Sequence, residues 1–238
     1  MTSALGSGPL LSFPVLPSTQ DKAAELLAKG ESVGIVLAHQ QTKGRGRLQR
    51  TWLSEPGASL TASFVMTAYA DWPKPFLVGM AVAVAAAGVL HCHLQWPNDL
   101  VIGPHKLGGI LTELVPDKKG RKIPVVGIGV NLNQKAFPPE IADRAVSLFL
   151  DRGGEYIPET VARQIDERLT SLPDPHEWQD LQPHWAAFDL TRGKSYELPD
   201  GRRALAIEIG HDGRLVAAIE GEPIEVLAAD AIFGAAEA

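Results

Sequence analysis

A polar stretch in the first quarter of the chain alternates glycine with arginine, as Gly44-Arg45-Gly46-Arg47. Glycine allows the backbone to approach a ligand closely, and the planar guanidinium group of arginine binds carboxylate and phosphate oxygens in pairs. The segment therefore predicts a loop that covers an anionic ligand. An exposed basic turn, or a weak nucleic-acid patch, would have the same composition, so charge alone leaves these interpretations open.

The overall charge limits what this loop can bind. The chain has 22 basic and 28 acidic residues among 238, a net charge of −6. A surface of that sign repels polyphosphates in general, so an anion site must be local. The Walker A pattern GxxxxGK[ST] is absent from the sequence, which excludes a P-loop nucleotide site.

The cysteine content and the hydropathy of the sequence indicate in which cellular compartment the protein works. The single cysteine, Cys92, excludes an intramolecular disulfide and a thiolate zinc cage, which fits a reducing cytoplasm. His91 and His93 flank it but do not complete a metal-ligand set. The longest apolar stretch, residues 76–90, is shorter than the roughly 20 residues of a membrane-spanning helix. We therefore expect a cytoplasmic protein with no membrane role.

The segments around the loop show patterns of regular structure. Residues 18–21 precede apolar residues at helical spacing and predict a hydroxyl-capped helix over about 20–28, ended by Gly30. A short strand is expected around 10–16 in an otherwise irregular lead-in, and residues 39–57 are too polar for a regular buried element. Further strands are expected over 33–38, 60–66, 94–96, 100–102, 107–115 and 125–132, and helices over 75–90, 161–169 and around 176–188.

After Asp189 the pattern changes to short alternating runs separated by turn residues. The runs cover 195–198, 204–209, 215–219 and 224–227, and the turns are Asp200-Gly201, Asp212-Gly213 and Gly221. Such spacing is typical of a small β-barrel. We therefore expect two domains, residues 1–188 and residues 189–238.

Four segments together resemble the biotin protein ligases. QTKGRGRLQRTW, residues 41–52, is similar to the biotin-binding loop QTxGRGRxGRxW of that family, except that Gln49 stands where the family has glycine. Residues 96–99 resemble its WPND segment, residues 106–113 its KLxGIL motif, and residues 127–133 its GIGxNxN segment, in the same order. The resemblance extends from about Val15 to the C-terminus and is weak beyond Asp189.

The resemblance implies an α+β fold, in which a mixed sheet like that of class II aminoacyl-tRNA synthetases is flanked by helices and followed by a small SH3-like β-barrel. It implies an enzyme that activates biotin with ATP and Mg²⁺ to biotinoyl-5′-AMP and then transfers biotin to a lysine of a biotin carboxyl carrier protein. Relatives also suggest a homodimer formed through a sheet edge.

The resemblance also assigns roles around biotin. Ser18, Thr19 and Gln20 match the family's STN segment, which contacts the ureido ring, with Gln20 in place of asparagine. Without the resemblance, this segment is read simply as a helix cap. Gln41 matches a glutamine beside the ligand, where its amide can both donate and accept. Trp52 either closes over the ligand or packs at the foot of the loop.

The remaining roles concern the phosphates. Arg45 and Arg47 are assigned to ATP and the adenylate, and Gly46 lets the loop wrap over biotin. Lys106 is the principal catalytic candidate, on the biotin carboxylate and α-phosphate. Gly109 is expected to keep a strand bare where the ligand lies against it. Asp99 orients Lys106 or binds magnesium, and Asn131 lies on the nucleotide side. Gln49 is expected to change the rate at which the loop closes, because glutamine rarely takes positive φ.

Two other functions remain open. A lipoate or octanoate ligase shares the fold and differs in the acid, although the GRGR loop favours biotin. A non-catalytic module that binds a ligand or nucleic acid is favoured only by the basic loop. Some relatives repress transcription through an N-terminal winged helix-turn-helix domain, for which the roughly 17 residues before Ser18 are too few. Specific DNA binding is therefore not expected.

Overall fold

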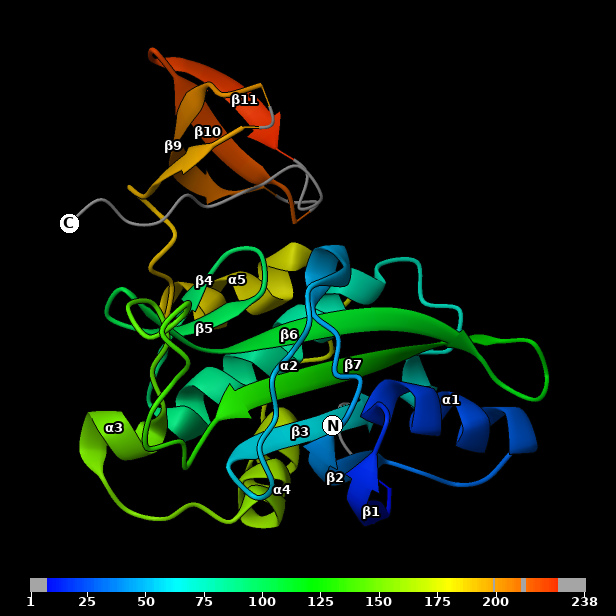
Figure 1. Cartoon of the computed structure of the whole chain (residues 1–238). Helices are drawn as coiled ribbons and strands as arrows, with labels where there is room; N and C mark the ends of the chain where they lie inside the picture. Colours follow the sequence, from blue (N-terminus) through cyan, green and yellow to red (C-terminus); the bar gives the residue numbers. More distant parts are fainter. Residues whose placement is uncertain (1–7, 199, 211–212, 227–238) are drawn as a thin grey trace.

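The computed structural model describes residues 8–198, 200–210 and 213–226 (Figure 1). Its larger part is a seven-stranded mixed sheet with the strand order β1-β2-β3-β7-β6-β5-β4, in which only β1 and β2 pair in parallel. The strands are β1 Leu10–Leu16, β2 Ile35–Gln41, β3 Ser59–Val65, β4 His93–Gln95, β5 Asp99–Ile102, β6 His105–Pro116 and β7 Lys122–Asn131.

Helices cover both faces of this sheet. One face packs against α2, α4 and α5, and the other is partly covered by α1. The bounds are α1 Thr19–Lys29, α2 Pro75–Leu90, α3 Leu148–Arg152, α4 Pro158–Leu169 and α5 Trp178–Ala186, with short 3-10 turns η1 Arg47–Gln49 and η2 Thr67–Tyr69. Helix α2 lies close to β6 because Gly79 has no side chain; an added Cβ would lie 2.2 Å from the Thr112 hydroxyl.

Side chains of β7 alternate between the two hydrophobic cores on opposite faces of the sheet, and part of one face carries only glycines. Val126, Ile128 and Val130 point towards α2, because successive side chains alternate between the faces of a sheet. On the opposite face, Val125 packs under α1, but the next residues on that face are Gly127 and Gly129. At Gly127 and Gly129, strand β7 therefore has no side chains of its own on this face.

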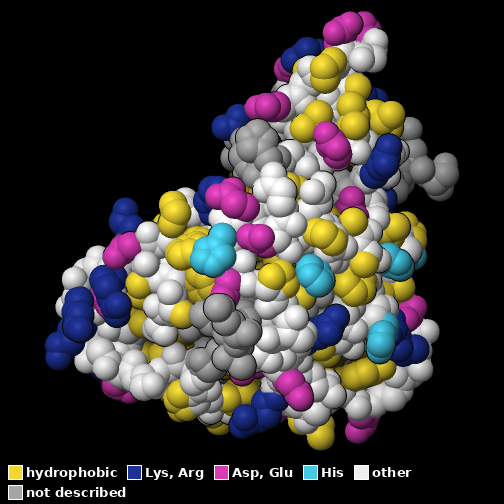
Figure 2. Space-filling model, turned by 180° about the vertical axis from the view of Figure 1, so that it is seen from behind, with side chains coloured by type: hydrophobic (Ala, Val, Ile, Leu, Met, Phe, Trp, Pro, Cys, Tyr) yellow, Lys and Arg dark blue, Asp and Glu magenta, His cyan; other side chains and the backbone are white. Residues whose placement is uncertain are grey.

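The smaller part is a four-stranded antiparallel sheet with the order β11-β10-β9-β8. It stands above α5 and the β4 end of the large sheet (Figure 1) and protrudes from the larger body when seen from behind (Figure 2). Its strands are β8 Ser195–Glu197, β9 Arg203–Ile209, β10 Leu215–Ile219 and β11 Glu222–Val226. The expected fold class, a mixed sheet flanked by helices and followed by a small antiparallel β unit, is confirmed.

Most predicted elements are present, with shifted ends. Helix α2 and strand β1 match the predicted ranges, and α1 is capped by Ser18 and ends at Gly30, which adopts left-handed backbone. Strand β2 extends three residues beyond its predicted end, to the partly buried Gln41, because it pairs with β1 as far as Leu16. Helix α3 was not predicted. Residues 1–7, Asp212 and Leu227, which also entered the predictions, lie outside the described residues.

Candidate functional site

A cavity of about 840 Å³ lies over the bare part of the large sheet, on the face that carries α1. Segments from α1, β2, the GRGR loop (Gly44–Trp52), β5, β6 and β7 surround it. The structure brings every residue predicted for the site to this cavity: Ser18, Thr19, Gln20, Gln41, Arg45, Gly46, Arg47, Trp52, Asp99, Lys106, Gly109 and Asn131. Residues separated by more than one hundred positions in sequence therefore share one space.

Glycines form the floor of the cavity. Strands β6 and β7 pair Gly109 with Gly129, and Gly127 lies two residues further along the same face. The indole of Trp52 lies directly against Gly129, since a Cβ there would be 2.5 Å from the ring. Trp52 thus packs on the floor in this structure, and its buried Nε1 has no hydrogen-bond partner among the described residues.

The N-terminus of α1 holds one wall. Ser18 Oγ caps the helix by accepting from the Asp21 N–H at 3.4 Å. The backbone N–H and the hydroxyl of Thr19 both donate to Gln41 Oε1, at 2.7 and 3.2 Å. Because the oxygen of Gln41 is already used, its Nε2 remains as the group that can donate to a ligand carbonyl.

Gln20 contributes a buried oxygen to the same wall. Its side chain is 6% exposed and its Nε2 donates to the Leu111 carbonyl at 3.1 Å. Its Oε1 has no hydrogen-bond partner among the described residues. A buried acceptor without a donor costs about 1–3 kcal/mol, so this oxygen is suited to accept from a ligand N–H.

The two arginines of the loop have different surroundings. Arg45 forms ion pairs with Asp21 Oδ1 at 2.9 Å and Glu113 Oε2 at 3.3 Å. Burial alone would lower the pKa of Arg45, but these two carboxylates outweigh it and raise the pKa. Arg47 is more deeply placed, donates to Asn98 Oδ1 at 3.1 Å, and has its pKa lowered by burial. Both side chains stay charged at neutral pH, since arginine titrates far above it.

Lys106 stands beside the glycine floor. Its Nζ lies 2.6 Å from Asp99 Oδ1 and close to Gly109, where an added Cβ would be 3.6 Å from Nζ. Asp99 is at the start of β5 and Lys106 near the start of β6, and the pairing of these strands brings the two side chains together. The ammonium group is therefore held over the bare strand.

Asn131 ends the floor on the far side from α1. Its Nδ2 donates to the Val146 carbonyl at 3.1 Å, and its Oδ1 accepts from Gln134 Nε2 at 3.3 Å. Gln134 also donates to Ser59 Oγ at 2.6 Å, while its buried Oε1 has no partner among the described residues. Gln134 was not predicted, because nothing in the local pattern marks a single glutamine after a strand.

The GRGR loop folds back on itself. Gly46 N–H donates to the Arg50 carbonyl at 2.7 Å, and Trp52 N–H donates to the Gly44 carbonyl at 3.0 Å. Leu48 has left-handed backbone, at φ 54°. The expected effect of Gln49 on the rate at which the loop closes stays a prediction.

Other candidate features lie outside the cavity. Among the described residues, no three His, Cys, Asp or Glu side chains are grouped closely enough to hold a metal ion. His91 ends α2 with left-handed backbone, and Cys92 is buried with its pKa raised to about 12. None of the helices described has the length and apolar character needed to cross a membrane.

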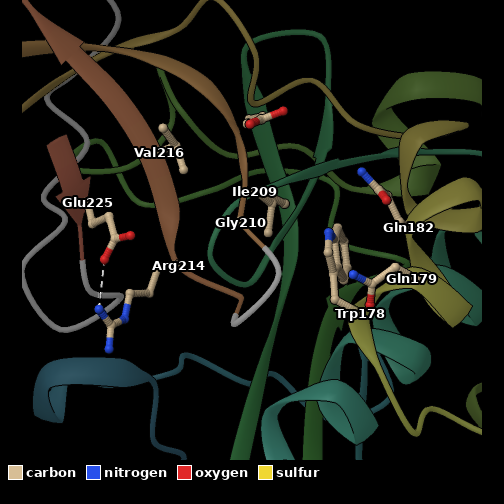
Figure 3. A pocket seen from close by; sticks show the side chains of 9 residues that line it. Trp178, Gln179, Gln182, Ile209, Gly210, Arg214, Val216 and Glu225 are labelled. Atoms are coloured by element: carbon tan, nitrogen blue, oxygen red, sulfur yellow. Dashed lines mark hydrogen bonds and ion pairs between the residues drawn. The ribbon is translucent and has the colours of Figure 1, made fainter. Parts of the chain in front are cut away.

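A second cavity of about 250 Å³ lies between α5 and the small sheet. Figure 3 shows Trp178, Gln179 and Gln182 on one side, with Ile209 and Val216 on the other. None of the residues predicted for the site lines this space. The candidate chemistry is therefore confined to the cavity on the large sheet.

Comparisons with known proteins agree with this geometry. Residues 12–133 match the Biotin/lipoate A/B protein ligase family. The biotin--[acetyl-CoA-carboxylase] ligase of Mycobacterium tuberculosis is 31% identical over 92% of this chain and 87% of its own length. The bifunctional ligase/repressor BirA of Bacillus subtilis is 36% identical over 58% of the chain, and the match spans only 46% of that longer relative.

Among solved structures, the biotin protein ligase from Aquifex aeolicus in complex with biotin and ATP has a TM-score of 0.75. It is 25% identical, and the similarity covers 95% of this chain and 99% of that one. The apo structure of the same ligase, at 20% identity and a TM-score of 0.76, supports the fold. With the family match over half of the chain and the relative covered almost end to end, the chain belongs to the biotin protein ligases of the Biotin/lipoate A/B protein ligase family.

Proposed function

We propose that this protein activates biotin with ATP and transfers it to a lysine of a biotin carboxyl carrier protein. In the first step, a biotin carboxylate oxygen attacks the α-phosphorus of ATP, forming biotinoyl-5′-AMP and releasing pyrophosphate. In the second step, a neutral lysine amine attacks the acyl carbon, and AMP leaves with the electron pair of the broken bond. The observation that carries the proposal is one cavity lined by Lys106, Arg45, Arg47 and the buried Gln20 Oε1, an acceptor without a partner among the described residues.

The strand register suggests how biotin and nucleotide share this space. Gly127 and Asn131 are four residues apart on β7, which corresponds to roughly 13 Å along the strand. The ureido ring of biotin would lie near Gly127, where Gln20 Oε1 accepts an N–H and Gln41 Nε2 donates to the ring carbonyl. The nucleotide would lie towards Asn131 and Gln134, and the carboxylate would meet the α-phosphate between the two ends.

Lys106 and Arg47 border this middle section, where two anions must approach each other. Cations fixed before the reaction reduce the repulsion and stabilise the charge that develops on the phosphoryl group. No side-chain nucleophile is required, because the carboxylate of biotin is itself the nucleophile. Arg45 holds Asp21 and Glu113 with one nitrogen each, so the remaining N–H groups of its guanidinium are the donors that would serve the adenylate.

Magnesium is a further part of the proposal. Mg²⁺ commonly uses one or two protein carboxylates together with water and substrate phosphates, so a site for it needs few protein ligands. Asp99, at the wall of the cavity beside Lys106, offers such a carboxylate, and the donor set is therefore compatible with the ion. When bound, Mg²⁺ would neutralise phosphate charge and favour the departure of pyrophosphate.

The GRGR loop is proposed to protect the product of the first step. A mixed anhydride reacts with water, so a loop over the cavity retains it until the acceptor lysine arrives. The acceptor, a biotin carboxyl carrier protein, then needs access to the same cavity. We also propose that the enzyme works in the cytoplasm and forms a homodimer through an edge of its sheet. Analytical ultracentrifugation would test the homodimer.

The decisive experiment is exchange of labelled pyrophosphate into ATP in the presence of biotin, lipoate or octanoate. We expect exchange with biotin, followed by transfer to a purified biotin carrier domain when that domain is added. Exchange only with lipoate or octanoate would show that the protein is a lipoate or octanoate ligase of the same family. A failure of all three acids to support exchange would contradict the proposed activity.

A further inference from the structure

The segment that leads into the small sheet is joined directly to β4. Leu94 N–H donates to the Phe188 carbonyl at 2.9 Å, and Leu190 N–H donates to the Leu94 carbonyl at 2.8 Å. Asp189 thereby forms a parallel bridge with Leu94 at the edge of the large sheet. Four residues after Leu190, Lys194 Nζ donates to Gln95 Oε1 at 2.6 Å. The chain just before the small sheet is thus hydrogen-bonded to β4.

Two further hydrogen bonds to this part of the chain come from Trp96, which is 2% exposed. Its backbone N–H donates to Thr191 Oγ1 at 2.8 Å, and Thr191 is 1% exposed. Its indole Nε1 donates to the Gly213 carbonyl at 3.0 Å, in the turn before β10. Both donors of one tryptophan are therefore used by residues about one hundred positions away, in buried surroundings where losing a partner is costly.

Trp96 is the first residue of the WPND segment (Trp96–Asp99), and its last two residues touch the cations of the cavity. Asn98 Oδ1 accepts from Arg47, and Asp99 pairs with Lys106. Asn98 is also bound to β6, through its carbonyl and its side-chain amide on Ile110. A shift at Trp96 would therefore be transmitted over two or three residues to both cations.

The contact between the small sheet and α5 is looser. Between α5 and the small sheet lies the cavity of about 250 Å³, with Trp178 facing Ile209 and Gly210 across it (Figure 3). Protein interiors are otherwise closely packed, so a space of this size indicates that α5 does not fix the sheet tightly. Hydrogen bonds at 94–96 are thus the more specific attachment.

We propose that Thr191 is a positioning residue, whose buried hydroxyl holds the WPND segment so that Asn98 and Asp99 fix Arg47 and Lys106 for adenylation. The predicted effect on adenylation rests on the proposed function. The ordering of residues 96–99 by Thr191 can be tested without any activity. Thr191 acts through Trp96 and touches neither substrate.

Three substitutions separate the hydroxyl from the volume of the side chain. Thr191→Val keeps the shape and removes the hydroxyl, Thr191→Ser keeps the hydroxyl, and Thr191→Ala removes both. We expect Thr191→Val and Thr191→Ala to lower kcat for biotin-dependent pyrophosphate exchange about tenfold, and Thr191→Ser to restore it. The affinity for biotin alone, measured by calorimetry, should stay within twofold, because the ureido end of the cavity lies near α1.

A matched control is Tyr69→Phe, which removes another buried hydroxyl that links distant segments, here to Asp174, without lining the cavity. It should not change the exchange rate. If Tyr69→Phe and Thr191→Val reduce activity equally, or if Thr191→Val weakens biotin binding as much as it lowers kcat, a general loss of stability explains the result and the inference is wrong.

Hydrogen exchange measured by mass spectrometry tests the structural part without catalysis. In Thr191→Val, peptides covering 94–102 should exchange faster, while peptides covering β3 should not change. Unchanged exchange at 94–102 would overturn the inference even if the wild-type protein is an active biotin ligase. An inactive wild-type protein with faster exchange in the variant would instead contradict the proposed function and leave the role in ordering the segment supported.

Discussion

The GRGR loop and the WPND segment border the same cavity but are held in opposite ways. Within the loop, backbone hydrogen bonds join Gly44 to Trp52 and Gly46 to Arg50, so they stay inside the loop. Leu48, near its tip, is 56% exposed and has left-handed backbone. In the WPND segment, Trp96 is buried and is bound to residues 95 and 117 positions away.

This difference assigns separate tasks to the two sides of the cavity. A segment whose backbone is bound to distant parts of the fold can move only if those parts move. A loop whose backbone hydrogen bonds are internal can move as a unit once the side-chain contacts of Arg45, Arg47 and Trp52 are released. Lys106, paired with Asp99 of the WPND segment, belongs to the fixed side. Arg45, carried by the loop, belongs to the movable side. The predictions below test that division, from the largest expected effect to the smallest.

The largest effect is expected for Lys106→Ala, on the fixed side. We expect the rate of biotin-dependent pyrophosphate exchange to fall by a factor of at least about one hundred. This corresponds to a loss of about 3 kcal/mol of transition-state stabilisation, because a positioned cation is lost. Lys119→Ala, in the exposed turn between β6 and β7, is the control and should leave the rate unchanged. Near-normal exchange by Lys106→Ala would remove this lysine from the reaction.

Gly129→Ala should affect the movable side through Trp52. The added methyl group would lie 2.5 Å from the indole, so the ring must leave the floor of the cavity. We expect biotin affinity to fall by roughly one order of magnitude or more, with a shift in tryptophan fluorescence of the free protein.

Gly109→Ala provides the comparison for Gly129→Ala. A Cβ at Gly109 makes only ordinary contacts, the nearest at 3.6 Å to Lys106, so the fluorescence of the free protein should not change. Biotin affinity should nevertheless fall, since the methyl group occupies the floor. An identical fluorescence shift in both variants would show that the shift does not come from displacement of Trp52 by the methyl group at position 129.

Arg45→Ala is expected to have a smaller effect on adenylation and a distinct effect on release. We expect formation of biotinoyl-5′-AMP to continue, with leakage into solution increased about tenfold and biotinylation of unrelated lysines increased accordingly. Radiolabelled adenylate passed through a filter, with and without an acceptor domain, measures both. Comparable leakage from the wild-type protein would contradict the retaining role of the loop.

The smallest effect concerns Cys92, outside the cavity. Burial raises the pKa of this thiol to about 12, from an ordinary value of 9.0. Above pH 9 the unfolded chain loses the thiol proton and the folded chain keeps it, so stability falls as pH rises through that window. Between pH 9 and pH 10 the wild-type protein should lose about 1 kcal/mol more unfolding free energy than Cys92→Ala. The unfolding free energies of both proteins can be measured by urea titration at each pH. If they fall in parallel as the pH rises, the thiol is accessible in the folded state.

The elements with strong local signals could be predicted from the sequence. Ser18 and Gly30 bound α1 through a hydroxyl cap and a left-handed glycine, and Pro75 starts an apolar helix that ends at Leu90. Helix α3 has only five residues, too few to show a period. Strand β2 extends through polar residues because its neighbour β1 pairs with them, which is a tertiary cause absent from the local sequence.

For the cavity, motif order identified which residues converge, but not what they bind in the folded chain. The contacts of Arg45 with Asp21 and Glu113 join three elements, and no spacing along the chain predicts them. The same holds for Thr191 and Trp96. The backbone of the loop was also beyond prediction, because nothing in the sequence indicates that Leu48, a residue with a bulky side chain, takes left-handed backbone.

Among the described residues, nothing donates to the side-chain carbonyl of Gln20, so stability and binding compete at this position. A glutamine here leaves a buried acceptor that costs stability, whereas a leucine of similar volume would need no donor. Natural proteins tolerate such costs where function requires them, as a trade-off between stability and activity. Biotin at saturating concentration should therefore raise the melting temperature of this protein more than ATP does.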